Sequence, residues 1–196
     1  MNIEYILATH NQNKVVEINH LLEGFPVTIK SLSDINYSEE IIEDGMTLEE
    51  NAFIKAETIF REFGKNALGE DTGLEVEALG GAPGVYTARY GGPERSAHQN
   101  MNKLLDKLKG IENRKARFRT CIALITNDKK QLFEGVVEGK IGLKKKGEFG
   151  FGYDPIFIPD GYSQTFAEIP LIEKSKISHR ARAMNKLIEF LMELYN

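Results

Sequence analysis

The sequence predicts an α/β domain with a mixed β-sheet whose two faces are partly covered by helices. Short apolar runs of strand length alternate with amphipathic segments in the first third of the chain, which is typical of strands joined by helices. Further along, two strand-like runs flank the polar turn "NDKK", which is typical of an antiparallel hairpin. A sheet that contains both kinds of connection is mixed.

The N-terminal part of the chain is predicted to form a strand, a helix and a second strand. The run "IEYILA" (3–8) is apolar enough for a buried strand. The segment "KVVEINHLLEG" (14–24) has apolar residues at helical spacing and ends in a glycine that stops the helix. The run "VTIKSL" (27–32) is predicted to be a short second strand.

A second helix is predicted from Thr47 to Gly64. Thr47 and Glu50 form the spacing of a capping box, in which two side chains bond the free N–H groups of a helix start. One face of this helix is apolar and carries Ala52, Phe53, Ala56, Ile59, Phe60 and Phe63. The run "NALGED" (66–71) follows and is predicted to be a short strand that ends in two acids. In the next segment, "GLEVEALG" (73–80), acids alternate with apolar residues, which is the pattern of a half-exposed strand with Glu75 and Glu77 facing solvent.

The rest of the chain is predicted to contain two more helices around the hairpin. The segment "SAHQNMNKLLDKLKG" (96–110) is amphipathic, and the hairpin strands are "ARFRTCIALIT" (116–126) and "QLFEGVVEGKIG" (131–142). The final helix (178–195) has Ser178 as its predicted N-cap. Its inward face is predicted to carry Ala181, Met184, Leu187, Ile188 and Leu191.

Composition indicates one domain, residues 1–196, of an ordinary globular protein. Hydrophobic residues make up 41% and charged residues 28% of the chain. The net charge of −4 argues against binding to DNA or RNA polymers, which needs many phosphate contacts. The one cysteine, Cys121, excludes an internal disulfide and is predicted to be a buried thiol. With neither a signal peptide nor an apolar run of about 20 residues, the chain is expected to be soluble and cytoplasmic.

Polar residues follow the first strand in "ATHNQNK" (8–14), where a helix is predicted to begin. Free N–H groups at a helix start attract anions, and Lys14 adds a full positive charge, so this loop could hold phosphate. Asn11 or Asn13 could equally be an ordinary helix cap. The nearest match to a Walker loop, "GKNALGED" (64–71), has Glu-Asp where Lys-Ser/Thr is required, which disfavours a P-loop enzyme.

Acidic residues gather in two places that suit a divalent cation. Glu70 and Asp71 end the predicted strand 66–71, and neighbouring carboxylates repel one another unless a cation lies between them. Magnesium commonly uses one or two carboxylates together with substrate phosphates. Because neighbouring strand residues point to opposite sides, only one of these two acids can be a direct ligand, and we expect Asp71. The cluster "EEIIEDG" (39–45) is either a charged surface loop or contributes Glu43 to the same metal.

Two further segments combine residues that suit a nucleotide. In "GEFGFGYDPIFIPDGY" (147–162), aromatic residues could stack on a base, or they could stabilise a turn before a strand at 156–158. In "EKSKISHRARA" (173–183), cationic side chains converge on a helix start, against the helix dipole, which suggests a nearby anion or carbonyl group. A solvated basic patch remains the alternative. The other histidines lack zinc-ligand spacing.

Taken together and in this order, the motifs resemble the inosine triphosphate pyrophosphatase family, which acts on non-standard purine nucleoside triphosphates. The segments that carry the resemblance are "ATHNQNK", "EDTGLEVEALGGAPGVYTARY", "FGYDPIF" and "KISHRARA". The resemblance implies a two-lobed domain around a long mixed β-sheet flanked by helices, with the active site in the cleft between the lobes. It implies Mg²⁺ dependence, a homodimer, and hydrolysis of ITP, dITP and XTP to the monophosphate and pyrophosphate, which cleanses the nucleotide pool.

The resemblance also implies roles for individual residues. Asp71 would be the general base and a metal ligand, and Glu43 a further metal ligand. Thr72 would lie beside the base. The residues implied for the triphosphate and sugar are Thr9, His10, Asn11, Gln12, Asn13, Lys14, Lys55 and Arg89. Those implied for the nucleobase pocket and its surroundings are Phe151, Gly152, Tyr153, Asp154, Lys174, His179 and Arg180.

The chain departs from the family pattern in three segments, at four residues in all. Many members have Asp-Asp-Ser-Gly where this chain has "EDTG" (70–73), and Ser-Ala-Arg where it has "TAR" (87–89). Both changes keep carboxylate and hydroxyl chemistry. His10 replaces a small or amide residue, which leaves its contact open.

Other functions stay open at this point. One is a pyrophosphatase of other modified nucleotides, like the Maf group, and another is a nucleotide-binding module without catalysis. A glycoside hydrolase with a carboxylate pair is a third, but the cations at Lys14, Lys174, His179 and Arg180 suit a polyanion better than a neutral sugar.

Overall fold

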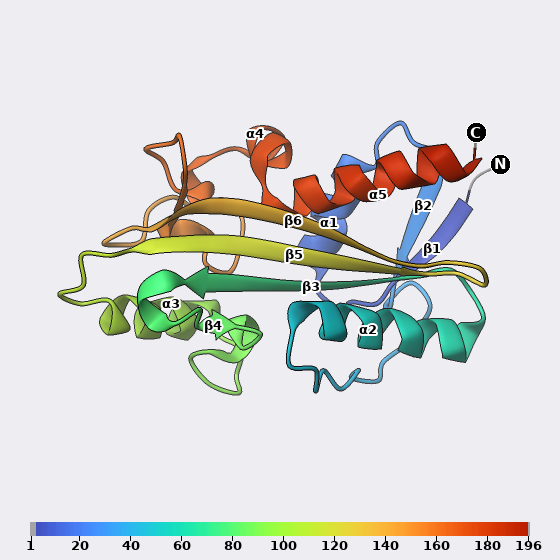
Figure 1. Cartoon of the computed structure of the whole chain (residues 1–196), viewed down its shortest axis with the longest axis horizontal. Coiled ribbons are helices and arrows are strands. Elements are labelled where there is room, and N and C mark those ends of the chain that lie inside the picture. Colours follow the sequence, from blue (N-terminus) through green and yellow to red (C-terminus); the bar gives the residue numbers. More distant parts are fainter. Residues whose placement is uncertain (1–2, 196) are drawn as a thin grey trace. The chain divides into compact units, whose positions relative to one another are not determined.

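The computed structural model describes residues 3–195, apart from the side chain of Tyr195, and has the mixed α/β architecture that the sequence predicts. The helices and strands are α1 (Gln12–Leu21), α2 (Leu48–Phe63), α3 (Ala97–Lys107), α4 (Leu171–Ile177), α5 (His179–Tyr195), β1 (Ile3–Leu7), β2 (Val27–Ser31), β3 (Ala67–Val76), β4 (Pro83–Gly84), β5 (Lys115–Ile125), β6 (Lys130–Ile141) and β7 (Phe157–Pro159). The strands pair in the order β2-β1-β3-β5-β6-β7, and β4 pairs with β3 (Figure 1).

The described chain divides into two compact units, each assembled from separate stretches of sequence. The first unit comprises residues up to Asp71, then 120–135, then 180 onward. The second comprises 72–119 and 136–179. Strands β3, β5 and β6 each give residues to both units.

The first unit is built on parallel strands covered by helices on two sides. Strand β1 lies parallel to both β2 and β3, with Ile3 opposite Val27 and Leu7 opposite Leu68. Helices α1 and α5 lie on one side of these strands and α2 on the other (Figure 1). The core on the α1/α5 side joins Tyr5 and Leu7 to apolar residues of both helices, among them Ile18, Met184, Leu187 and Leu191.

Helix α2 packs very closely on β3 at Gly69. A Cβ built on Gly69 would lie 1.9 Å from the Ala52 carbonyl oxygen and 2.7 Å from the Ala56 nitrogen, so only glycine fits there. The helix begins with the predicted capping box, because Glu50 N donates to Thr47 Oγ1 and the Glu50 side chain accepts from Thr47 N. These contacts fix the first turns of α2 against the middle of β3.

The second unit has antiparallel pairing and an aromatic core. Strand β4 pairs with β3, and β7 pairs with β6 through Gly139 opposite Pro159. Phe118 lies 4.7 Å from the ring of Phe157 and 6.3 Å from that of Phe166, measured between centroids. Residues of α3, including Met101 and Leu104, pack against the same core.

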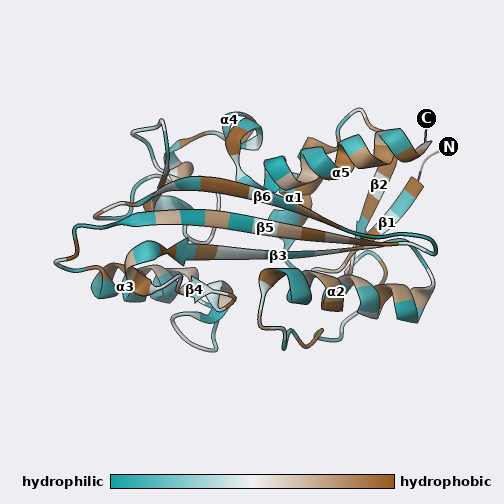
Figure 2. Cartoon of the chain, viewed as in Figure 1, coloured by the Kyte–Doolittle hydropathy of each residue, from teal (hydrophilic) through white to brown (hydrophobic). Residues whose placement is uncertain are grey.

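Most of the predicted elements are confirmed, with two differences. The five residues expected on the inward face of the last helix are all buried, and hydrophobic and hydrophilic residues alternate along α2 and α5 (Figure 2). The prediction that a strand ends at Asp71 is wrong, because β3 continues to Val76 and places both acids in its middle. Helix α4 was not predicted. Among the described residues, no helix has the length and apolar character needed to cross a membrane.

Candidate functional site

Lys55 and two carboxylates form the centre of a polar cluster in the first unit. Lys55 Nζ lies 2.9 Å from Glu43 Oε2 and 3.3 Å from Asp71 Oδ1. Lys55 comes from α2, Asp71 from β3, and Glu43 from the loop before α2. The close packing at Gly69 explains why Lys55 reaches Asp71, since it holds α2 against the strand that carries Asp71. Residues 28 positions apart in sequence thus converge on one ammonium group.

The carboxylates control the charge of Lys55. Burial favours the neutral amine, but Asp71 and then Glu43 outweigh it, so the pKa of Lys55 lies above its ordinary value. The ammonium is therefore charged throughout the physiological pH range. The Lys55 ammonium can attract a polyanion, and the two carboxylates beside it can attract a cation, so the cluster suits a site that binds both.

Asn51 belongs to this cluster and was missed by sequence reasoning. Its Nδ2 donates to Asp71 Oδ2 at 3.3 Å, and its Oδ1 accepts from Gly45 N at 2.9 Å. Asn51 lies four residues before Lys55, so the two share one helix face. Asn51 and Lys55 lie on the same buried face of α2 as Ala52 and Ala56, and two polar residues on an otherwise apolar face were the signal that could have indicated Asn51. Asn51 and Lys55 together hold both oxygens of Asp71.

Glu43 and Asp71 fit the expected divalent cation. Their oxygens already approach a single positive group, Lys55 Nζ, and oxygen donors are what Mg²⁺ prefers. Side chains of Glu43 and Asp71 are 33% and 13% exposed, which leaves each carboxylate partly accessible. The donor chemistry and the convergence of the two acids are thus compatible with a shared metal ion.

A buried ionic network lies next to this cluster. Arg180, which is 1% exposed, donates from Nε and Nη2 to Glu70 Oε1 at 3.1 and 2.8 Å, and its Nη1 pairs with Glu17. These contacts join α5, β3 and α1. Burial opposes the charge of Arg180, but Glu70 and Glu17 raise its pKa above the ordinary value. Glu70, next to Asp71 in β3, is therefore engaged by an arginine.

Lys14 also approaches Glu70. Its Nζ lies 3.4 Å from the Glu70 carbonyl oxygen and 3.6 Å from Glu70 Oε1. Burial lowers the pKa of Lys14, and the charge of Glu70 offsets this only in part. Lys14 is thus an ammonium whose proton is held less firmly than that of an exposed lysine.

The segment before Lys14 forms the start of α1. Asn11 is the N-cap, because its side chain accepts from Asn13 N at 3.0 Å, and Thr9 Oγ1 accepts from Asn11 N at 3.1 Å. His10 Nε2 lies 3.1 Å from the Glu39 carbonyl oxygen, and Gln12 Nε2 donates to Ser33 Oγ at 3.4 Å. The cap interpretation is confirmed for Asn11, while its side chain and those of His10, Gln12 and Asn13 are exposed.

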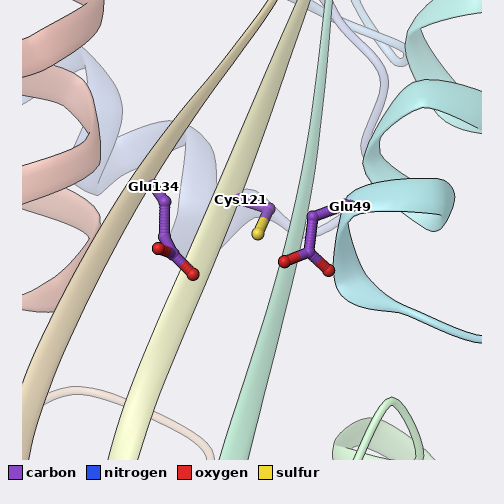
Figure 3. A group of neighbouring side chains, drawn as sticks. All are labelled: Glu49, Cys121 and Glu134. Carbon is purple, nitrogen blue, oxygen red and sulfur yellow. The ribbon is translucent and has the colours of Figure 1, made fainter.

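A separate group of possible metal ligands contains the cysteine. Glu49 of α2, Cys121 of β5 and Glu134 of β6 each offer an atom within 4.8 Å of the others, with both carboxylates extending toward the thiol (Figure 3). Cys121 is buried, as predicted. The group contains neither Glu43 nor Asp71, and its soft sulfur does not suit Mg²⁺. It is therefore a different set from the expected magnesium ligands.

The second unit holds its own buried ion pair. Lys174 Nζ donates to Asp154 Oδ2 at 2.7 Å, and both residues are 3% exposed. The same oxygen accepts from Phe151 N at 2.8 Å, so Asp154 also fixes the turn at Phe151. Lys174 Nζ lies 5.3 Å from the centre of the Phe151 ring, within range of a cation–π interaction. A Cβ on Gly150 would lie 2.0 Å from Asp154 Oδ2, which explains the glycine before Phe151.

The other predicted site residues of the second unit differ in their surroundings. The ring of His179, which is buried, stacks on Phe118 with centroids 4.7 Å apart. Tyr153 is buried too, and its hydroxyl donates to the Thr87 carbonyl oxygen at 3.0 Å. Thr72 and Gly152 are half-buried. The Arg89 guanidinium lies over the Tyr86 ring, 5.2 Å from its centre.

The model of the Ham1 family matches residues 5–190, nearly the whole chain. The chain belongs to the Ham1 family. Two relatives of this Ham1 chain, each named "dITP/XTP pyrophosphatase", are 49% identical to it: the protein of Christiangramia forsetii, aligned over 96% of this chain and 99% of its own length, and that of Bacillus licheniformis, over 96% and 97%.

A solved Ham1 structure has the same fold. The Ham1 protein of Staphylococcus aureus superposes with a TM-score of 0.88 at 38% identity, covering 97% of this chain and 98% of its own. The α/β fold of this Ham1 chain is thus that of its family, and the family resemblance predicted from the four motifs is confirmed.

Proposed function

We propose that this protein is a nucleoside triphosphate pyrophosphatase that hydrolyses non-standard purine nucleotides, ITP, dITP, XTP and dXTP, to the monophosphate and pyrophosphate. The single observation that carries the proposal is the convergence of Glu43 and Asp71 on Lys55. Membership of the Ham1 family and the names of the relatives support the choice of substrate.

In the proposed reaction, water attacks the α-phosphorus and the bond from that phosphorus to the bridging oxygen breaks. Pyrophosphate leaves with the bridging oxygen and its electron pair, and Asp71 takes the proton of the attacking water. Asn51 and Lys55 orient the Asp71 carboxylate, each through one of its oxygens. Lys14 and Lys55 neutralise phosphate charge, while Thr9, the residues 10–13 and Arg89 contact the triphosphate and the sugar.

Glu43 and Asp71 would hold a magnesium ion in this reaction. When bound, the ion would neutralise phosphate charge and lower the pKa of water. Fixed charges of the protein contribute in the same direction, because phosphoryl transfer is accelerated mainly by positioning and electrostatics.

For the nucleobase, we propose recognition by Phe151, Gly152, Asp154, Lys174 and His179, with Thr72 beside the base. Tyr153 and Arg180 are buried in hydrogen bonds and ion pairs, so we assign them to the surroundings of the pocket. A 6-oxo group accepts hydrogen bonds that the 6-amino group of adenine cannot accept, and a mismatched donor in a buried site costs affinity. The single Phe151 N–H already donates to Asp154, whereas Lys174 Nζ, which also donates to Asp154, carries three N–H groups, so we propose Lys174 and His179 as the donors to the base.

The test is an assay of pyrophosphate release from dITP, XTP, dGTP and ATP, with and without Mg²⁺. The proposal expects Mg²⁺-dependent release from dITP and XTP and much slower release from ATP. Equal rates on all four would end the claim of selectivity. Activity on other modified nucleotides alone would favour the Maf-like alternative, and binding without hydrolysis would favour a non-catalytic module.

We also propose that the enzyme acts in the cytoplasm as a homodimer, as the family resemblance implies. Sedimentation of the purified chain tests the second point, because a dimer has twice the mass of the 22.1 kDa chain.

A further inference from the structure

The segment that carries Arg89 has no regular strand or helix longer than one turn, yet it is tightly held. It runs from Tyr86 through the short helix Thr87–Arg89 to Gly91. A loop of this kind moves unless its backbone groups find partners elsewhere. The question is therefore which side chains fix it, since the place of the Arg89 guanidinium depends on them.

Asn100 of α3 binds the backbone on both sides of Arg89. Its Nδ2 donates to the Ala88 carbonyl oxygen at 2.9 Å, and its Oδ1 accepts from Gly91 N at 2.5 Å. Asn100 is 3% exposed, so water cannot readily replace either bond. One buried amide thus clamps the residue before Arg89 and the residue two positions after it.

Helix α3 approaches this segment so closely that a side chain larger than glycine would clash at position 91. A Cβ on Gly91 would lie 2.7 Å from both the Asn100 nitrogen and the Gln99 carbonyl carbon. The first turn of α3 is itself fixed, because Ser96 caps the helix by accepting from Gln99 N. Asn100, which makes both hydrogen bonds, therefore belongs to a helix with a capped N-terminus and not to another loop.

Thr87 anchors the start of the same segment. Its Oγ1 accepts from Leu74 N at 2.8 Å and donates to the Gly84 carbonyl oxygen at 2.6 Å. The Thr87 carbonyl oxygen accepts from the Tyr153 hydroxyl. With its backbone held on both sides, Arg89 extends a half-buried side chain over the ring of Tyr86, which is 56% exposed.

We propose that Asn100 is a positioning residue that holds Arg89 in place to bind the phosphates of the substrate. This inference rests on the proposed function for the role of Arg89, but the clamp itself rests on the two hydrogen bonds of Asn100. A shift of about 1 Å in a binding group can cost up to about 100-fold in rate, so loss of the clamp should be measurable.

The test is a double-mutant cycle of Asn100→Ala and Arg89→Ala. Each protein is measured for pyrophosphate release from dITP and, by calorimetry, for binding of inorganic tripolyphosphate in the presence of Mg²⁺. In the wild-type background, Asn100→Ala should reduce kcat/KM about 10- to 100-fold, mostly through KM, and weaken tripolyphosphate binding. In the Arg89→Ala background it should change either value less than about threefold.

Asn102→Ala is the matched control. Asn102 lies on the exposed side of α3, and its side chain also makes two hydrogen bonds, with Lys145 and His98. It should leave kcat/KM unchanged. If Asn100→Ala does not fold, Asn100→Asp replaces it, because the aspartate keeps the acceptor for Gly91 N and loses the donor to Ala88.

Equal losses from the Asn100 variant in both backgrounds would overturn the proposal, since the effect would then not pass through Arg89. Absence of tripolyphosphate binding by the wild-type protein would overturn it too. If the wild-type protein binds tripolyphosphate with the expected coupling but releases no pyrophosphate from dITP, the proposed function fails and the positioning role of Asn100 stands.

Discussion

The Lys55 ammonium donates to Asp71 Oδ1 at 3.3 Å, while Asn51, one helical turn earlier, donates to the other oxygen of the same carboxylate at 3.3 Å. Asp71 is thus oriented from both sides by one face of α2. This arrangement depends on the distance between α2 and β3, which Gly69 sets.

Gly69→Ala should damage both stability and activity. The added methyl group would overlap the Ala52 carbonyl oxygen, so α2 must move away from the strand that carries Asp71. We expect the free energy of unfolding to fall by about 1–3 kcal/mol, as for other overpacked cores, and kcat to fall with it. Urea unfolding and the dITP assay measure the two effects. Gly110→Ala is the control, because nothing lies within 4 Å of its Cβ position and only its left-handed φ of +73° is penalised. Equal behaviour of the two variants would contradict the role of Gly69.

Lys14 should impose an alkaline limit on activity. Because burial lowers its pKa below 10.5, Lys14 loses its positive charge at a lower pH than an ordinary lysine. If this charge holds phosphate, kcat/KM for dITP should decline as the pH rises through that lowered pKa. In Lys14→Arg the decline should move to higher pH, since a guanidinium keeps its proton. If kcat/KM declines at the same alkaline pH in the wild-type enzyme and in Lys14→Arg, Lys14 does not bind phosphate.

Glu17→Ala should destabilise the first unit. It removes the carboxylate that pairs with Arg180 Nη1 and keeps the pair with Glu70, and breaking a buried ion pair typically costs about 3–5 kcal/mol. Glu173→Ala breaks the exposed pair with Lys176 and should cost less than about 1 kcal/mol. Denaturation midpoints compare the two variants. A Glu17 variant as stable as the Glu173 variant would show that the network contributes little.

Lys174→Met should weaken recognition of the base without affecting the phosphates. The change removes the donor that binds Asp154 and a candidate donor to the 6-oxo group. We expect KM for dITP to rise at least about 10-fold, which corresponds to one charged hydrogen bond. Inhibition by inorganic tripolyphosphate, which has no base, should stay within about threefold of wild type. If both constants change equally, Lys174 does not act on the base.

Local signals in the sequence predicted much of the fold. Thr47, Glu50 and Gly64 mark the two ends of α2, and the structure shows the capping box and a left-handed C-cap there. Helix α4 lacked such signals, since it is a single short helix of 7 residues that follows Pro170 without a side-chain cap. The end predicted for the strand at Asp71 was wrong because "EDTG" contains residues that favour turns, although the alternation of Leu74 and Val76 with acids correctly indicated strand beyond it.

The candidate site was only partly accessible to sequence reasoning. Acidic motifs indicated Asp71 and Glu43, the family resemblance implied Lys55, and the structure brings these three together. The partners of Arg180 could not be predicted, because Glu70 and Glu17 lie 110 and 163 residues away along the chain. Contacts of that kind depend on the packing of α1, β3 and α5 and leave no local pattern.

The central claim is tested most directly by pyrophosphate release from dITP by Asp71→Asn in the presence of Mg²⁺. The amide keeps the size of the side chain but cannot accept the proton of the attacking water. The account predicts a fall in turnover of at least about 100-fold, with an unchanged circular dichroism spectrum. A turnover close to that of the wild-type enzyme would contradict it.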